Sequence, residues 1–181
     1  MRSVRVISGM LLALSSALAV AQGAQSDSHL LPVDVQGRVV IPTVAEGSLL
    51  YLHGIAGEGV YISRNDEGEL CMVKPLHIVA GHVEQGRIRI HESGPLTLRI
   101  YSDRVSASLK KGEQVTSENL RVTDKEGDSS SDVVIEIGMN RQMHFILNPR
   151  RKWTSWLRGE RPKSGCKTVT EEDIARLPSR S

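Results

Sequence analysis

Between Val33 and Leu147 the chain is a succession of short runs in which apolar and polar residues alternate, separated by Gly, Pro, Asn, Asp and Ser. Alternation with a period of two is the pattern of a β-strand with one buried and one exposed face, whereas an amphipathic helix repeats its apolar residues every three or four positions. About ten such runs follow one another and no long helical period interrupts them. The sequence therefore predicts an all-β domain, either an antiparallel β-sandwich or a partly open barrel.

The limits of each strand are predicted from where the alternation begins and ends. The clearest two runs flank Ser93-Gly94-Pro95, a turn sequence, and we expect them to form a hairpin with one apolar face and one polar, solvent-exposed face. The glycine-rich stretch from His53 to Gly59 is interpreted as a tight hairpin turn. The predicted strands cover residues 34–41, 48–54, 59–64, 69–74, 77–83, 87–92, 96–101, 104–109, 119–123, 132–138 and 142–147.

The first 21 residues have the order of a Sec-type signal peptide. Arg2 and Arg5 precede a short apolar run, which ends in the small residues Ala19-Val20-Ala21. We expect cleavage after Ala21, a flexible lead-in over residues 22–31 and a soluble protein in the periplasm of a Gram-negative host. The apolar run is shorter than a membrane-spanning helix needs, and no cysteine follows it as a lipoprotein acceptor.

After the predicted β-domain, residues 32–147, comes a basic C-terminal extension, residues 148–181. It carries nine Lys and Arg against four acids, a net charge of +5. Without the signal peptide the chain has 21 basic and 21 acidic residues, so residues 22–147 carry −5. A basic tail on an acidic body indicates either an anionic partner or a tail that docks on its own body.

Both tryptophans of the chain lie in this extension, in a segment where a short helix over 151–158 would place them on one face with Leu157. Three interpretations remain open: packing onto the protein's own domain, docking on a partner protein, or contact with an anionic envelope surface. A second short helix is predicted after the cap Thr170, ending before Pro178. The residues predicted to bind a partner are Arg150, Arg151, Lys152, Trp153, Trp156 and Arg158.

Cys71 and Cys166 are the two cysteines of the chain. In an oxidising exported compartment an even pair favours a disulfide, and closing a loop of this length is worth about 4.5 kcal/mol in the chain-entropy estimate. The alternative is two unpaired thiols. Neither cysteine belongs to a Cys-x-x-Cys pair, so redox catalysis is not expected.

No catalytic motif is present. The sequence lacks a nucleophile elbow, a zinc-binding His-Glu-x-x-His helix and a phosphate loop. The acids of residues 124–132 lack the spacing of a calcium loop, and a solvated loop is predicted there. None of the histidines has helical i, i+4 spacing or a cysteine neighbour, so we expect no metal and no cofactor. The histidines are His29, His53, His77, His82, His91 and His144.

One local resemblance stands out in residues 106–120. Leu109, Gly112, Val115 and Leu120 match in spacing the opening of a SAF-type β-clip domain, which is found in flagellar P-ring chaperones and pilus-assembly proteins. The stretch resembles this family over 15 of 181 residues, and its continuation, residues 121–124, lacks the proline of the family pattern. The resemblance implies a glycine turn followed by a capped helical turn, and no functional residue is transferred from it.

These observations predict a non-enzymatic exported protein that binds a protein partner, as an accessory, chaperone-like or adaptor component of a pilus, secretion or flagellar assembly. Strand edges suited to strand addition and the Trp/Arg segment support this class. A small-molecule or glycan-binding sandwich with Tyr51, Tyr61 and Tyr101 in a groove is the alternative, followed by an envelope hydrolase. Export and the neutral charge after cleavage argue against nucleic acid.

Overall fold

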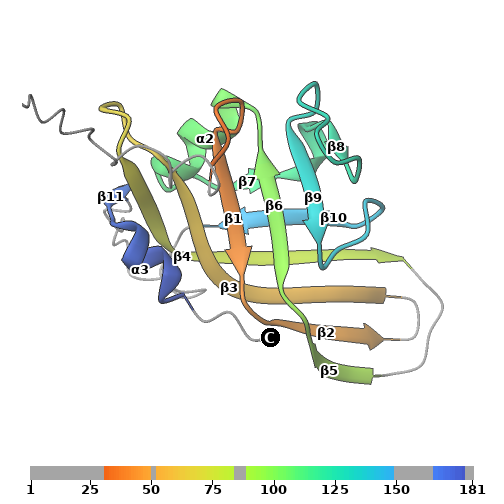
Figure 1. Ribbon diagram of the computed structural model, residues 1–181. Helices are drawn as coiled ribbons and strands as arrows, with labels where there is room; N and C mark the ends of the chain where they lie inside the picture. The colour runs from red at the N-terminus through yellow and green to blue at the C-terminus, as the bar shows by residue number, and fades with distance from the viewer. Residues whose placement is uncertain (1–30, 50–51, 84–88, 149–164, 178–181) are drawn as a thin grey trace, which may run out of the picture.

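The computed structural model describes residues 31–49, 52–83, 89–148 and 165–177, which form one strongly curled, mostly antiparallel sheet and two short α-helices (Figure 1). The predicted all-β class is confirmed. Of the two predicted architectures, the sheet has that of the partly open barrel, since it curls into a half-barrel. None of the helices in the described ranges is long and apolar enough to cross a membrane.

Four long, bent strands make up most of the sheet, and two of them are interrupted at the bend. The pieces are, in chain order, β1 (Gly37–Ile41), β2 (Val44–Leu49), β3 (Leu52–Arg64), β4 (Leu70–Val83), β5 (Arg89–Ser93) and β6 (Leu96–Ile100). β1 and β2 pair in succession with β3, while β6 and β5 pair with β1 and β2. In Figure 1 β1 and β6 run vertically and β2 and β5 horizontally, so the bend separates an upper half of the sheet from a lower half.

Further strands extend both halves. β9 (Val133–Ile137) pairs with β6 in the upper half, and β10 (His144–Asn148) pairs with β4 in the lower half. Three two-residue strands pair beside these: β7 (Val115–Thr116) with β10, β8 (Val122–Thr123) with β9, and β11 (Lys167–Thr168) with β4.

The bend lies at glycine and proline residues of the four strands. Gly59 in β3 lies so close to β1 that a Cβ there would overlap the Val40 carbonyl oxygen. The pairing of β3 with β4 is irregular at the same level, between Gly59 and Tyr61. Pro42 separates β1 from β2, and Pro95 separates β5 from β6. Because all four strands bend at one level, the two halves face each other across a common core.

The main hydrophobic core fills the space between the halves and is closed by helix α2 (Asp103–Lys110), which buries Val105 and Leu109. Tyr61 is the largest side chain in it, and its hydroxyl donates to the Ser106 Oγ of α2 at 2.7 Å. Burial raises the pKa of Tyr61. The buried hydroxyl is therefore satisfied by the helix that covers it.

A second hydrophobic cluster covers the outer face of the upper half. Residues 165–177, here called the C-terminal clasp, supply its cover through helix α3 (Glu171–Ala175) and its buried Ile174. Cys166 joins Cys71 in a disulfide with an S–S distance of 2.10 Å, and β11 pairs beside it with β4. The predicted disulfide and the predicted C-terminal helix are confirmed. The outer face under the clasp consists of Val60, Ile62, Leu70 and Met72, joined by Leu31 and Val35.

One predicted strand, 104–109, is wrong, because these residues form helix α2. Val105, Ala107 and Leu109 alternate, but the buried positions are Val105, Ser106 and Leu109, which is helical spacing. Ser102 caps the helix by accepting from the Val105 N–H, with Asp103 in the first turn. The Ser102 cap and the hydrogen bond between Ser106 and Tyr61 stabilise the helix, although the short alternating pattern also fits a strand.

Both predicted hairpin turns, at 53–59 and at 93–95, are also wrong. Residues 53–59 lie inside β3. The predicted strands 69–74 and 77–83 are likewise parts of one strand, β4. Gly94-Pro95 bends the chain between β5 and β6, which pair with β2 and β1 and not with each other. Alternation is the same in a hairpin and in a bent strand, so the pattern alone does not identify the neighbour.

The stretch that resembles the SAF domain contains the implied glycine turn and the implied helical turn, but not the side-chain cap of that turn. Gly112 has a φ of 74°, and Ser117–Asn119 form one 3-10 turn, η1. Thr116 at the N-cap makes no side-chain capping bond, and the Ser117 hydroxyl accepts instead from the Phe145 N–H. Gly112 follows the end of helix α2.

Candidate functional site

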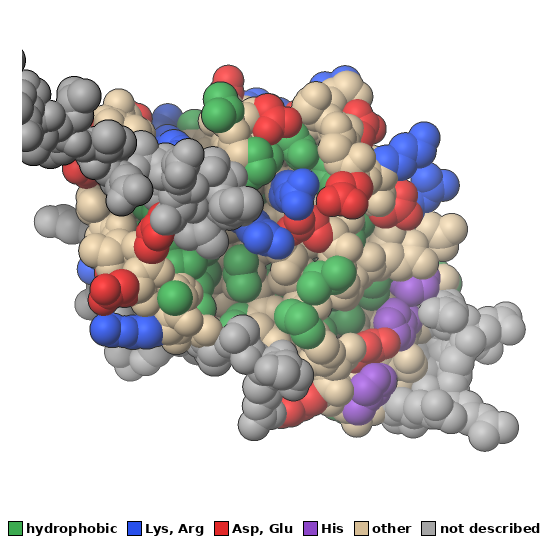
Figure 2. All heavy atoms as spheres, in the orientation of Figure 1, with side chains coloured by type: hydrophobic (Ala, Val, Ile, Leu, Met, Phe, Trp, Pro, Cys, Tyr) green, Lys and Arg blue, Asp and Glu red, His purple; other side chains and the backbone are tan. Residues whose placement is uncertain are grey.

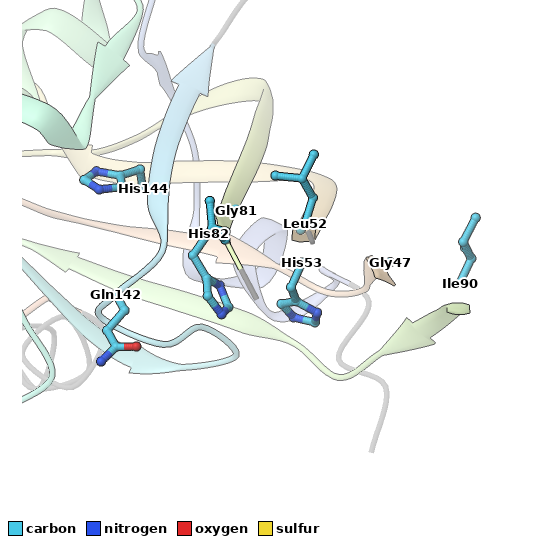
Figure 3. A pocket seen from close by; sticks show the side chains of 10 residues that line it. Gly47, Leu52, His53, Gly81, His82, Ile90, Gln142 and His144 are labelled. Carbon is cyan, nitrogen blue, oxygen red and sulfur yellow. The ribbon is translucent and has the colours of Figure 1, made fainter. Parts of the chain in front are cut away.

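The lower half of the sheet presents different chemistry on its two faces. Side chains of adjacent residues in a strand point to opposite sides, so His53 and His82 lie on the inner, concave face, while Leu52 and Ile90 point outward. Figure 3 shows His53 and His82 directed to one side of the sheet and Leu52 and Ile90 to the other. Both faces are candidate binding surfaces.

On the concave face, β2, β3, β4 and β5 bring polar side chains together. His53 and His82 are direct partners across β3 and β4, with ring centroids 5.3 Å apart. His53 Nδ1 lies 2.9 Å from Ser48 Oγ, and its Nε2 lies 3.2 Å from a Glu46 oxygen. The other Glu46 oxygen lies 3.5 Å from His91 Nε2. Figure 2 shows histidine side chains gathered at the lower right of the molecule, near acidic ones.

These residues border a hollow of about 820 Å³ at the mouth of the half-barrel, here called the polar hollow. The loop between β9 and β10 forms its opposite wall with Asn140, Gln142 and Met143. Glu46 is the one acidic residue that lines it, and no Lys or Arg does so among the described residues. The hollow therefore favours a ligand with a positively charged or hydrogen-bonding group.

Ser48, His53 and Glu46 form a hydroxyl–imidazole–carboxylate series, which raises the question of acyl-transfer chemistry. The tautomer with the proton on Nε2 lets His53 accept from Ser48 and donate to Glu46. Ser48, however, lies in a strand paired on both sides, with β3 and β5. Neighbouring backbone N–H groups therefore belong to sheet ladders and offer no oxyanion hole. In the described part of the chain no group of three or more His, Cys, Asp or Glu has an arrangement suited to a metal ion.

The outer face of the lower half is apolar and exposed. Gly47, Gly54 and Gly81 lie in one row across β2, β3 and β4, continued by Ile90 on β5 and His144 on β10. Glycine inside a strand leaves a place where another chain or ring can approach the backbone. The rows on both sides hold Leu52, Val79, Val83 and Ile146, whose exposed fractions range from 41% to 79%. We call this surface the apolar face: Ala45, Gly47, Leu52, Gly54, Ala56, Val79, Gly81, Val83, Ile90 and Ile146.

The half-barrel is open along β5. β6 pairs with β1 on one side and β9 on the other, whereas β5, its continuation, pairs with β2 alone among the described residues. The chain leaves β9 at Gly138, which has a φ of 84°, and runs into the loop that walls the polar hollow. The second edge of β5 therefore pairs with no other described strand and lies beside the hollow, as an edge of the kind to which a further strand can pair.

The predicted site residues are only partly placed by the structure. Cys71 and Cys166 form the disulfide, while the six predicted partner-binding residues, 150–152, 153, 156 and 158, lie outside the described residues. Tyr51 lies outside them too. Tyr61 is buried in the main core and Tyr101 packs against the second cluster, so these two tyrosines do not share a groove.

The convergence of His53, His82 and His91 was not predicted, and neither was the glycine row. Both depend on how β2 to β5 pair, which the alternation does not contain. The segment His53–Gly59 holds only one member of the row, since Gly54 lies on the outer side of β3 while Gly57 and Gly59 lie on its core side. Comparisons with protein-family models, curated proteins and solved structures find no match for this chain.

Proposed function

We propose that this protein is a non-enzymatic exported accessory or adaptor of a cell-envelope assembly, and that it binds an extended segment of a protein partner at the open edge of β5. The supporting observation is that the sheet ends at β5 directly beside the polar hollow. A strand added to β5 gains main-chain hydrogen bonds, and its alternate side chains enter the hollow. Export itself rests on the signal-peptide pattern, with which the disulfide agrees.

The chemistry of the partner follows from the two sides of β5. A side chain on the concave side of the added strand lies beside His91 of β5, and Glu46 lies behind His91 on β2, so a long basic side chain that reaches this carboxylate is the favoured contact. A side chain on the outer side meets Ile90, which is 78% exposed and favours an apolar neighbour. The partner segment is therefore extended, with basic and apolar residues in alternation.

The test is recovery of the partner from envelope extract, combined with backbone hydrogen exchange. Wild type is compared with Glu46→Gln, which removes one charge at nearly constant shape, and with Glu118→Gln, an exposed carboxylate on η1 far along the chain from β5. We expect Glu46→Gln to weaken recovery and Glu118→Gln to leave it unchanged. Binding should also slow exchange of the β5 amides, because strand addition engages them.

Equal recovery by wild type and Glu46→Gln, with unchanged exchange in β5, would refute strand addition at this edge. A shortened chain ending at Leu147 is an unsuitable control, since it lacks Cys166 and the cluster formed by Ile174. Point variants keep the clasp in place.

A second function is favoured by the convergence of Glu46, Ser48, His53, Asn140 and Gln142 on one hollow, namely binding of a small polar ligand or glycan. Such a ligand would perturb the ring resonances of His53 in an NMR titration while leaving the exchange of the β5 amides unchanged. The two functions are therefore separated by the same exchange measurement.

A further inference from the structure

The apolar face and the outer face of the upper half are parts of one surface, and they differ in what covers them. Val60 and Ile62 on β3 lie under the C-terminal clasp, while Leu52, on the same side of the same strand, is exposed. The glycine row adds a flat strip on which a planar side chain can lie against the backbone. An exposed surface of this kind indicates an unassigned docking site.

The chain itself supplies a segment of matching chemistry. We propose that residues 150–158 dock on the apolar face of their own molecule, with Trp153 and Trp156 against the row formed by Gly47, Gly54 and Gly81. The inference goes beyond the proposed function, because it concerns the opposite face of the sheet from the polar hollow.

Chain length and end points support docking within one molecule. The segment 149–164 starts at Asn148, the direct partner of His77 on β4, and ends before Lys167, the partner of Met72 on β4. Five residues of strand separate these two positions, about 17 Å, whereas 16 residues extend to about 55 Å. The segment is therefore far longer than its end points require.

Trp153 is also close enough along the chain to Asn148 to reach the apolar face. Asn148 belongs to the outer-face row of His77, and Val79 and Gly81 follow two and four residues further along β4, about 7 and 13 Å away. Trp153 is five residues from Asn148 and so can extend about 17 Å from it. The indole can therefore reach the apolar face without displacing β10.

The charge beside the apolar face and the area of this face also favour residues 150–158 as its occupant. Glu58 lies exposed at the border of the apolar face, and the segment carries Arg150, Arg151, Lys152 and Arg158. The face spans five strands and three rows, on the order of 300 Å², which is below the roughly 800 Å² per partner of a stable dimer. Two tryptophans and a leucine suit this area better than a second copy does.

The protein offers a direct readout, because Trp153 and Trp156 are its two tryptophans. In the full-length protein we expect emission at shorter wavelength than in the urea-unfolded chain and protection from acrylamide quenching. Val79→Glu places a charge on the apolar face and should shift the emission to longer wavelength and raise quenching to the unfolded value. Ile137→Glu is the matched control, with 50% exposure against 48% for Val79 and a position on β9, outside the apolar face; it should change neither.

Circular dichroism of each variant establishes that the sheet remains folded. As a second arm, Trp153→Ala with Trp156→Ala should uncover the face and increase binding of an apolar dye, while Arg176→Ala, an exposed change on the clasp, should not. Solvent-exposed tryptophans in the native protein, or dye binding unchanged in the double variant, would overturn the proposal. So would protection that disappears on dilution, because that would show docking on a second copy.

Discussion

β3 and β4 carry apolar side chains on the same outer side in both halves of the sheet, yet the described residues cover only those of the upper half. In the upper half Val60, Ile62 and Met72 lie under the clasp, and the disulfide fixes the clasp to β4. In the lower half Leu52 and Val79 remain exposed among the described residues. The apolar pattern of a strand therefore indicates which side is to be covered, but not which segment covers it.

The two halves also differ in how their outer faces are built. Under the clasp the side chains are large and interlock, whereas the apolar face has a row of glycines at its centre. A packed cover is a fixed part of the fold, while a flat strip with no side chains accepts an incoming ring or chain. We therefore interpret the upper face as structural and the lower face as a docking surface.

The largest effect should come from removing the disulfide. Cys71→Ala with Cys166→Ala opens a loop of 95 residues, and we expect a loss of about 4.5 kcal/mol in the free energy of unfolding. Urea unfolding followed by circular dichroism measures it, and reduction of the wild type is the matched control. An unchanged midpoint in both would show that α3 and β11 hold the clasp without the covalent link.

Two valines on the same outer side test the comparison directly. Val60→Ala removes two methyl groups from a covered position and should cost about 2 kcal/mol, while Val79→Ala removes them from the apolar face and should cost less than about 1 kcal/mol. Urea unfolding of both variants gives the difference. A cost at Val79 equal to that at Val60 would mean that the lower half is covered as tightly as the upper half.

A smaller effect is expected at the helix that carries the cover. Thr170 caps α3 in a capping box with Asp173, so Thr170→Ala should cost about 1 kcal/mol. Thr168→Ala, an exposed change in β11, is the control and should be nearly neutral. If the two threonine variants unfold at the same urea concentration, the cap does not contribute to holding Ile174 in the second cluster.

Features specified by local chemistry were predictable from the sequence. The alternating runs predicted the fold class, the expectation of an oxidising compartment predicted the Cys71–Cys166 pair, and Thr170 with the following acids predicted α3. Helix α2 was missed because a few alternating residues fit both a strand and one face of a short helix.

Features specified by pairing were not predictable. The bend at Gly59 and the separation of β5 from β6 determine which strands become neighbours, and these neighbours create the rows of the candidate surfaces. His53 faces His82 only because β3 and β4 pair in one register, and a shift of one strand by one residue would place the two histidines on opposite faces. The sequence contains the components of both surfaces but not their arrangement.

The smallest expected effect is on the pH dependence of the clasp. Hydrogen bonds from the Thr170 backbone N–H and hydroxyl hold the pKa of Asp173 below its usual value. Since the folded pKa is the lower one, the ionised carboxylate stabilises α3 at neutral pH, and this stabilisation is lost as the pH falls through the folded pKa. Asp173→Asn should therefore reduce the difference in unfolding midpoint between neutral and acidic pH, while Glu118→Gln, outside the clasp, should preserve it. An unchanged difference in Asp173→Asn would place the acid sensitivity elsewhere, with Asp128 the next residue to test, because hydrogen bonds from Ser130 and Ser131 lower its pKa as well.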